Sequence, residues 1–214
     1  MELGKTMIFG DSYSTFVDYI PEGYDCCYKK LPPFEDVDCV EKTWWWQVIE
    51  NSQGSLLLND SFSGSTVCHT GYNGRDCKDN SFVARFLQYK ASGFFENNAP
   101  DTVFVFGGTN DNWAGSPLGE IKTCGFVEHD LYCVFPAFSF LIDQIKKTLP
   151  SAKIVIVLNC DLKKELEIGI KEICSKLGVC FVQLESVEKV SGHPTAVGMK
   201  QIASQILSVI DNKN

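Results

Sequence analysis

The segment TMIFGDS, residues Thr6–Ser12, sets the pattern from which the fold can be predicted. Thr6–Phe9 is a short run of residues that favour strands, and Gly10 ends it. Short apolar runs bounded by turn residues are typical of strands that are buried on both faces in a parallel sheet. We therefore expect Asp11 and Ser12 to lie just beyond the carboxyl end of a buried strand.

Runs of the same kind recur along the chain and alternate with helical patterns. The further strand candidates are Ser55–Asn59 (SLLLN), Thr102–Phe106 (TVFVF), Lys153–Leu158 (KIVIVL) and Val179–Gln183. Helices are predicted between and after them, over Trp44–Asn51, Asn80–Lys90, Pro136–Leu149, Leu162–Leu177 and Thr195–Ile210. This alternation predicts a doubly wound α/β domain of three layers. The polar stretch Pro21–Val40 has no periodicity, and we expect it to form a long surface loop.

Length, charge and cysteine content narrow the class of protein. A chain of 214 residues favours one domain over residues 1–214. The net charge of −8 argues against nucleic acid or an anionic membrane as the main partner, because both are bound by clustered Lys and Arg. The chain has no apolar stretch of the roughly 20 residues that span a bilayer. It also begins without the apolar segment of a signal peptide, so we expect a cytoplasmic protein. A chain of 214 residues can bury a core large enough to be stable without disulfides. The ten cysteines are therefore expected to be free thiols, with Cys160 and Cys180 in apolar runs.

Polar segments follow several of the predicted strands. They are Gly10–Ser14, Asn59–Thr66, Gly107–Asp111 and, just before the last helix, Gly192–Thr195. Ligands of open α/β sheets bind beyond the carboxyl ends of the strands, so these segments are expected to meet at one site.

Together the segments contain the groups that acyl transfer requires. A serine hydroxyl needs a neighbouring base to become a nucleophile, and we predict that His193 serves Ser12 in this way. The developing oxyanion needs fixed donors, for which the candidates are the main-chain N–H groups of Ser12 and Gly64 and the side-chain amide of Asn110. Each residue taken alone also has a structural interpretation, such as a helix N-cap for Ser12 or an Asx-turn for Asn110. Their combination favours catalysis.

In their order along the chain, these segments resemble the sequence blocks of the SGNH (GDSL-like) hydrolase superfamily. The matching segments are Gly10–Ser12 for the nucleophile block, Ser63–Thr66 for the glycine block, Gly108–Asp111 for the G-x-N-D block, and His193 with Pro194 and Gly198 for the histidine block. The resemblance extends over nearly the whole chain. It implies a flavodoxin-like three-layer α/β/α sandwich with a five-stranded parallel sheet, and hydrolysis of an ester or thioester by a Ser-His centre. The G-x-S-x-G motif of the competing α/β-hydrolase fold is absent.

One position departs from the family pattern. The family usually has an aspartate three residues before the histidine, where this chain has Val190. The group that orients the imidazole is therefore missing from its usual place. A main-chain carbonyl near Val190 or Ser191 could accept from the histidine Nδ1–H and leave a Ser-His dyad; alternatively, Glu188 or Glu185 could supply the carboxylate. We expect the carbonyl, because both glutamates are out of register.

Aromatic residues near the predicted site are candidates for substrate binding. Trp113 follows Asn110 by three residues and Tyr13 adjoins Ser12, so we expect both to line the pocket. Trp45, within the run Trp44–Trp46, has two interpretations that remain open: a core residue or part of a wall that stacks on a sugar or acyl group. Arg75 is interpreted as a surface residue, with substrate anchoring as the alternative.

These observations predict a serine esterase that releases a small acyl group, acetyl above all, from a carbohydrate or similar polar alcohol. An acyltransferase, or a lipase or thioesterase of the same fold, is the nearest alternative. A non-catalytic carbohydrate-binding protein is another, favoured only by Val190. Cys124, His129 and Cys133 fit no familiar zinc pattern, so we expect no metal, and the mechanism needs no organic cofactor. The sequence leaves the oligomeric state open.

Overall fold

A computed structural model describes residues 2–211 and contains a central sheet of five strands. All strand pairs in it are parallel, in the order β2-β1-β3-β4-β5. The strands are β1 Gly4–Gly10, β2 Gly54–Ser61, β3 Thr102–Phe106, β4 Lys153–Leu158 and β5 Cys180–Gln183. Every residue of β3 is buried, because β3 is central and helices cover both faces of the sheet. This double coverage explains the continuous apolar runs in the sequence.

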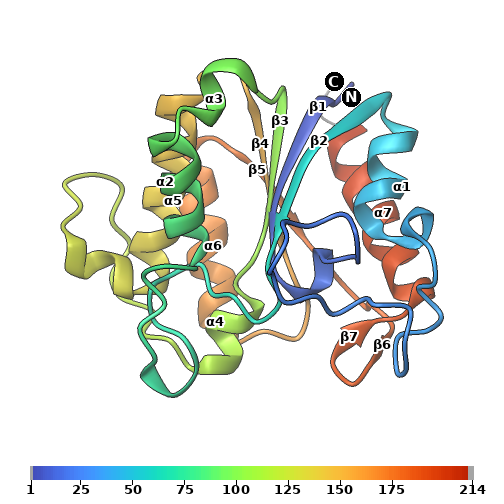
Figure 1. Cartoon of the computed structure of the whole chain (residues 1–214). Coiled ribbons are helices and arrows are strands. Elements are labelled where there is room, and N and C mark those ends of the chain that lie inside the picture. The colour runs from blue at the N-terminus through green and yellow to red at the C-terminus, as the bar shows by residue number, and fades with distance from the viewer. Residues whose placement is uncertain (1, 212–214) are drawn as a thin grey trace.

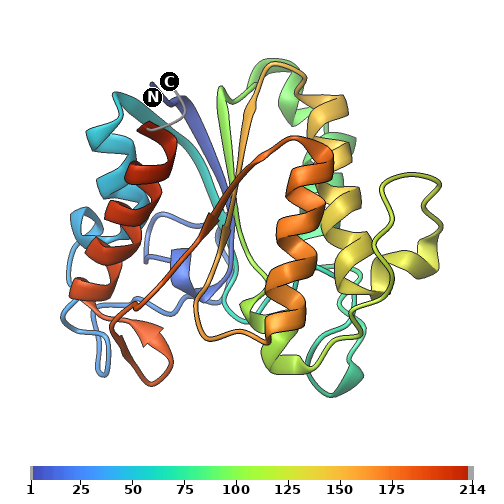
Figure 2. The ribbon, with the colours of Figure 1, turned by 180° about the vertical axis from the view of Figure 1, so that it is seen from behind.

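Helices pack on the two faces of the sheet and complete the three layers (Figures 1 and 2). One face carries α2 Phe82–Ala91, α3 Phe94–Asn97, α5 Val134–Thr148 and α6 Lys164–Leu177; the other carries α1 Trp44–Asn51 and α7 Ala196–Asp211. The predicted three-layer α/β/α fold with five parallel strands is confirmed.

Successive strand residues supply the two hydrophobic cores in turn. In β3, Val105 belongs to the core beneath α2 and α5, whereas Phe106 belongs to the core beneath α1 and α7. Phe106 meets Trp44 of α1 with ring centroids 5.5 Å apart. On the opposite side, Phe9 of β1 meets Phe86 of α2 at 5.7 Å. The alternation follows from the two-residue side-chain period of a strand.

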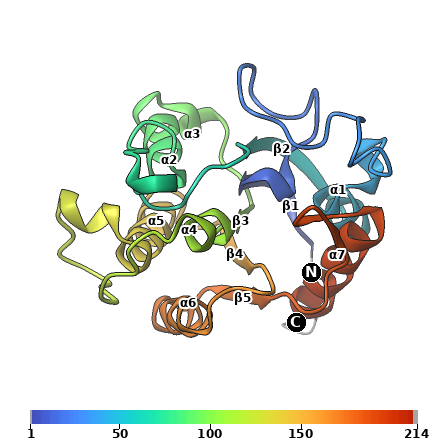
Figure 3. The ribbon, with the colours of Figure 1, turned by 90° about the horizontal axis from the view of Figure 1, so that it is seen from below.

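The strand order puts the topological switch point, where doubly wound sheets form their ligand crevice, at the carboxyl ends of β1 and β3. The chain leaves β1 toward β2 on one side and then returns past β1 to form β3 on the other. The segments that follow β1 and β3 therefore diverge, and such a switch point is where doubly wound sheets bind ligands. Figure 3 looks onto this edge, with the end of β1 and helix α4 (Thr109–Ala114) close to its centre.

Two small elements that the periodicity did not predict lie at the same edge. Helix α4 follows β3 immediately, and its N-cap Gly108 has a φ of 95°. The second element is a two-stranded antiparallel hairpin of β6 Lys189–Val190 and β7 His193–Pro194. Its two turn residues, Ser191 and Gly192, have φ angles of 48° and 79°. Positive φ at both positions is typical of a type I′ turn, whose twist suits a tight hairpin.

The segment predicted as a surface loop contains no regular element from Pro21 to Cys39, but it is not wholly at the surface, since Tyr28 and Val37 are fully buried. None of the ten cysteines, all of which lie within residues 2–211, forms a disulfide, and Cys68, Cys160 and Cys174 are buried. Within residues 2–211, no helix has the length and apolar character needed to cross a membrane.

Candidate active site

Ser12 lies two residues beyond the end of β1 and is 3% exposed. It begins a short 3-10 helix, Ser12–Ser14, whose first turn is closed by Asp11: the Asp11 carboxylate accepts from the main-chain N–H of Tyr13 at 3.0 Å. Gly10 is required just before this turn, because a Cβ there would come within 2.4 Å of the Ser61 hydroxyl. The tight turn presents the serine hydroxyl at the carboxyl edge of the sheet.

The β6–β7 hairpin brings His193 to Ser12 from the other end of the chain. The Nε2 atom of His193 lies 2.9 Å from the Ser12 hydroxyl oxygen, and its Nδ1 atom lies 3.1 Å from the main-chain oxygen of Ser191. A carbonyl oxygen can only accept, so this network assigns the proton to Nδ1 and leaves Nε2 free to accept from Ser12. An imidazole in this state can take the proton of the serine hydroxyl.

Burial lowers the pKa of His193 below its ordinary value of 6.5. The hydrogen bond to Ser191 acts in the opposite direction, and the positive charge of Lys189 lowers the pKa further. The neutral imidazole, which is the form that can act as a base, is thereby favoured at neutral pH.

Two buried tyrosines hold the hairpin in place. The Tyr13 hydroxyl donates to the carbonyl oxygen of Gly192 and accepts from Nδ2 of Asn159 at 3.1 Å. The Tyr28 hydroxyl donates to the carbonyl oxygen of Pro194 at 2.8 Å. Both tyrosines come from segments distant in sequence from His193, so these bonds fix the ring of His193 relative to the nucleophile turn.

Gly64 lies in the turn that follows β2, and Asn110 lies in α4, which follows β3. Gly64 has a φ of 81°, and a Cβ placed on it would meet open space, so its main chain faces a hollow. Asn110 is buried in the first turn of α4, and its Oδ1 atom accepts from the Tyr72 hydroxyl at 2.7 Å. The Nδ2 atom of Asn110 is also buried and has no hydrogen-bond partner among the residues that the structure describes. It is therefore a free donor.

A hollow of about 290 Å³ lies next to Gly64. Its lining includes the polar residues Asp25, Tyr72, Arg75 and Asn80. Asp25 and Arg75 are exposed, and no ion pair joins them to each other among the described residues. The hollow thus offers both a hydrogen-bond donor and an acceptor beside Gly64.

The comparisons with known proteins agree with this geometry. The family model described as GDSL-like Lipase/Acylhydrolase matches residues 4–210. A crystal structure from Bacteroides ovatus, described as a GDSL-like lipase, is 38% identical with a TM-score of 0.89, and the match covers 98% of this chain and 99% of that one.

The chain belongs to the GDSL-like lipase/acylhydrolase family.

A second GDSL-like lipase structure, from Bacteroides uniformis, is 37% identical with a TM-score of 0.87, over 98% of this chain and 96% of that one. An acetyl xylan esterase from Butyrivibrio proteoclasticus shares the fold at 17% identity and a TM-score of 0.62, over 100% of this chain and 64% of that one. No curated protein matches the chain. As a member of the GDSL-like family, the protein is an ester-hydrolysing enzyme of the SGNH type.

The carboxylate that this family usually provides is replaced in the structure by a main-chain carbonyl. Val190 pairs with His193 across the hairpin, and the acceptor at Nδ1 is the oxygen of Ser191. The Glu188 carboxylate instead accepts from the Thr195 hydroxyl at 2.5 Å. The main-chain N–H of Glu185 is bonded to Gln205 of α7, so the segment that carries Glu185 is held against that helix.

Two of the candidate substrate-binding residues are core residues in this GDSL-like enzyme: of the two interpretations of Trp45 the structure favours the core one, and the prediction that Tyr13 lines the pocket is wrong. Trp45 is fully buried and donates its indole N–H to the carbonyl oxygen of Ser14 at 3.0 Å. Tyr13 is also fully buried, and its hydroxyl supports the hairpin. Trp113, in contrast, is 43% exposed, and its ring centroid lies 6.0 Å from that of His193. Arg75 lies at the surface, as predicted, but lines the hollow beside Gly64.

Sequence reasoning missed a buried arginine that joins the loops of the site. Arg85 of α2 forms an ion pair with Asp60, and both side chains are at most 1% exposed. The same guanidinium donates to the carbonyl oxygen of Gly10 at 3.2 Å and to the Ser65 hydroxyl at 3.1 Å. It therefore ties the end of β1 to the turn that contains Gly64. Within a helical pattern, one arginine gives no sequence signal for this role.

Two buried aspartates brace the site in a similar way. Burial raises the pKa of Asp11 to about 7, and a second acid, Asp111, contributes to the shift. Asp111 accepts from the main-chain N–H groups of Val67 and Cys68 at 2.9 and 3.1 Å. Its bonds fix the start of α4 against the loop that follows β2.

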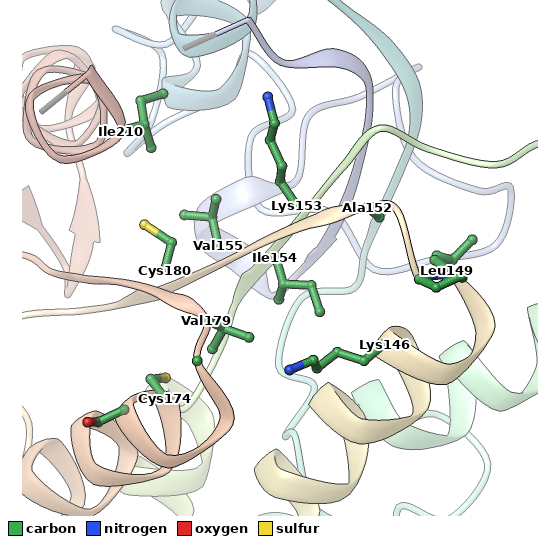
Figure 4. A pocket seen from close by; sticks show the side chains of 13 residues that line it. Lys146, Leu149, Ala152, Lys153, Ile154, Val155, Cys174, Val179, Cys180 and Ile210 are labelled. Atoms are coloured by element: carbon green, nitrogen blue, oxygen red, sulfur yellow. The ribbon is translucent and has the colours of Figure 1, made fainter. Parts of the chain in front are cut away.

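A larger hollow, of about 520 Å³, lies at the opposite edge of the sheet (Figure 4). It is formed where β4 and β5 begin, with Lys153, Ile154 and Cys180 among its lining residues. Figure 4 shows mainly aliphatic side chains there, together with Lys146 and Lys153. This edge is remote from Ser12 and His193, which lie at the carboxyl ends of the strands.

Proposed function

We propose that this enzyme removes a small acyl group, acetyl above all, from a carbohydrate or similar polar alcohol, through an acyl-enzyme on Ser12. The observation that carries the proposal is the 2.9 Å contact between the Ser12 hydroxyl and Nε2 of His193, with the other imidazole nitrogen held by Ser191. A hydroxyl and a base within hydrogen-bond reach, with the base oriented by a third group, constitute an activated nucleophile.

In the first step, the Ser12 oxygen attacks the ester carbonyl carbon while His193 accepts the serine proton at Nε2. The resulting imidazolium donates this proton to the leaving alcohol oxygen as the C–O bond breaks, which leaves the acyl group on Ser12. In the second step, His193 accepts a proton from water, and the water oxygen attacks the acyl carbon. The imidazolium then returns the proton to Ser12 as the carboxylic acid leaves.

The oxyanion of both tetrahedral intermediates is assigned to three donors: the main-chain N–H groups of Ser12 and Gly64, and Nδ2 of Asn110. The unpartnered state of the buried Asn110 Nδ2 supports this assignment, because a buried donor normally has a partner. A carbonyl at Nδ1 carries no net charge. It orients the imidazole as a carboxylate would, but it stabilises the imidazolium less.

Three features favour a polar alcohol with a small acyl group. Trp113 presents an exposed ring beside His193, which protonates the leaving group, so a sugar bound as the alcohol would lie against that ring. The hollow beside Gly64 contains Arg75 and Asp25, which suit hydroxyl groups better than an alkyl chain. The acetyl xylan esterase that shares the fold acts, by its name, on an acetylated sugar polymer.

The test is hydrolysis of 4-nitrophenyl esters of increasing acyl length, together with acetylated xylo-oligosaccharides. We expect the highest kcat/KM for acetyl and a steep decline by octanoyl. Ser12→Ala should be inactive, whereas the exposed Ser204→Ala on α7 should retain wild-type activity. Preference for octanoyl esters would identify a lipase, and acyl transfer to added alcohols in preference to water would identify an acyltransferase. Sugar binding by a wild-type protein that hydrolyses none of these esters would overturn catalysis altogether.

A further inference from the structure

Tyr72 is the side chain that holds the amide of Asn110. Its hydroxyl donates to Asn110 Oδ1 at 2.7 Å, although Tyr72 comes from the segment after β2 and Asn110 from α4, after β3. Tyr72 also lines the hollow beside Gly64. The phenol therefore borders the same hollow as Gly64 and is bonded to the amide whose Nδ2 is a free donor.

We propose that Tyr72 is a positioning residue of the oxyanion hole, acting through Asn110; this inference rests on the proposed esterase function. An Asn side chain can rotate to exchange its oxygen and nitrogen. With Oδ1 occupied by the tyrosine O–H, Nδ2 is directed toward the crevice as a donor. In the reversed orientation an oxygen would face the developing negative charge, and the hole would lose a donor and gain a repulsive group.

The loop that carries Tyr72 is held firmly enough for such a role. Its ends are joined by a bridge between Thr70 and Asp76, and the main-chain N–H of Gly71 donates to the oxygen of Arg75 at 2.8 Å. The Thr70 hydroxyl donates to the Tyr132 carbonyl oxygen at 2.7 Å, which attaches the loop to the 3-10 helix Glu128–Tyr132. A loop anchored in this way can position a side chain without help from bound substrate.

The hydrogen bond from Tyr72 to Asn110 should stabilise mainly the transition state. Donation to Oδ1 polarises the amide, which makes the Nδ2–H group a stronger donor, and consecutive hydrogen bonds strengthen one another. The series of hydrogen bonds from the Tyr72 hydroxyl through the Asn110 amide to the oxyanion therefore gains strength as negative charge develops. An interaction that strengthens in the transition state raises kcat and leaves KM nearly unchanged.

A double-mutant cycle of Tyr72→Phe and Asn110→Ala on 4-nitrophenyl acetate tests the proposal. Tyr72→Phe should lower kcat by roughly 3- to 10-fold, the range expected for one net hydrogen bond, with KM changed less than about twofold. Asn110→Ala should lower kcat by roughly 10²- to 10³-fold. In the Asn110→Ala background, Tyr72→Phe should have no further effect. An equal loss in both backgrounds, or no loss in the wild-type background, would overturn the proposal.

Tyr132→Phe is the matched control, since it removes a phenol hydroxyl that bonds Asp76 of the same loop without touching Asn110. It should leave kcat unchanged, and a comparable loss would indicate that the loop as a whole is responsible. The cycle is repeated with an organophosphate that modifies Ser12, because the P=O oxygen of this reagent occupies the same oxyanion hole. The rate of modification is followed by mass spectrometry of the intact protein. If the wild type hydrolyses no carboxylic ester, the proposed function fails, whereas coupling between Tyr72 and Asn110 in the modification rate still decides this inference.

Discussion

The Nδ1 nitrogen of His193 lies 3.1 Å from the main-chain oxygen of Ser191, two residues earlier in the same hairpin. The type I′ turn makes this contact possible, because Ser191 and Gly192 both adopt positive φ and bring the carbonyl back toward the ring. The hairpin thus supplies from its own backbone what the family usually takes from a side chain. A side chain at position 190 is then not needed for orientation, and Val190 is compatible with an oriented histidine.

From this contact we predict that Glu188→Gln leaves kcat/KM within about threefold of wild type. The Glu188 side chain bonds Thr195, and glutamine retains an oxygen acceptor at that position. Steady-state kinetics on 4-nitrophenyl acetate provide the measurement. A loss on the order of 10⁴-fold, the effect of altering a true triad acid, would show that Glu188 is the missing carboxylate.

The second prediction concerns the pH dependence of the reaction. Only the neutral imidazole can accept the serine proton, and burial lowers the pKa of His193 below 6.5. We therefore expect kcat/KM to rise with pH through a midpoint below 6.5 and to be level above it. In the interval between the folded pKa and 6.5 the unfolded chain binds more protons, so stability should also rise with pH there.

Lys189→Met tests the electrostatic part of this prediction. The charge of Lys189 contributes to the lowered pKa of His193, so its removal should raise that pKa and move the midpoint of the rate profile to higher pH. Lys176→Met, which removes an exposed lysine of α6, is the matched control and should leave the midpoint unchanged. A midpoint that moves equally in both variants would point to net charge rather than to the local contact.

Most of the fold follows from hydrophobic periodicity alone. The bounds predicted for Thr102–Phe106, Lys153–Leu158 and Trp44–Asn51 coincide with β3, β4 and α1. These elements are long enough, and buried enough, for packing to dominate their sequences. The six residues of α4 and the two-residue strands of the hairpin are too short for any periodicity to show.

The sequence predicts those residues of the site that lie on segments next to the ends of strands. It does not predict the residues whose role depends on the direction of the side chain. Ser12 and His193 could be paired because parallel strands end at one edge. Tyr13 was expected to face the pocket because it adjoins Ser12, but the 3-10 turn directs its ring into the core. Tyr72 and Arg85 carry no local sequence signal, since each acts through a contact with a residue more than 20 positions away.

The third prediction concerns the buried ion pair that joins the site loops. Arg85→Met should destabilise the fold by about 3–5 kcal/mol, because it leaves the Asp60 carboxylate buried without its counter-ion. Arg85→Lys should also destabilise, since a single ammonium cannot reach Asp60, Gly10 and Ser65 together. Urea unfolding monitored by circular dichroism is the measurement, and Lys164→Met, at an exposed pair on α6, is the control. An unchanged unfolding midpoint in Arg85→Met would contradict the bracing role.

The fourth prediction separates binding of the alcohol from chemistry at Ser12. Trp113 is exposed beside His193, the residue that protonates the leaving alcohol in the proposed mechanism. If a sugar stacks on this ring, Trp113→Ala should raise KM for an acetylated xylo-oligosaccharide by roughly 10-fold, since such contacts contribute about 0.5–1.5 kcal/mol beyond burial. The kcat for 4-nitrophenyl acetate should change by less than about threefold, because the Ser12–His193 contact does not depend on Trp113. Trp113→Phe, which keeps an aromatic face, should restore most of the lost affinity. An equal loss on both substrates would mean that Trp113 supports His193 rather than the sugar, and the alcohol would then have to bind elsewhere along the crevice.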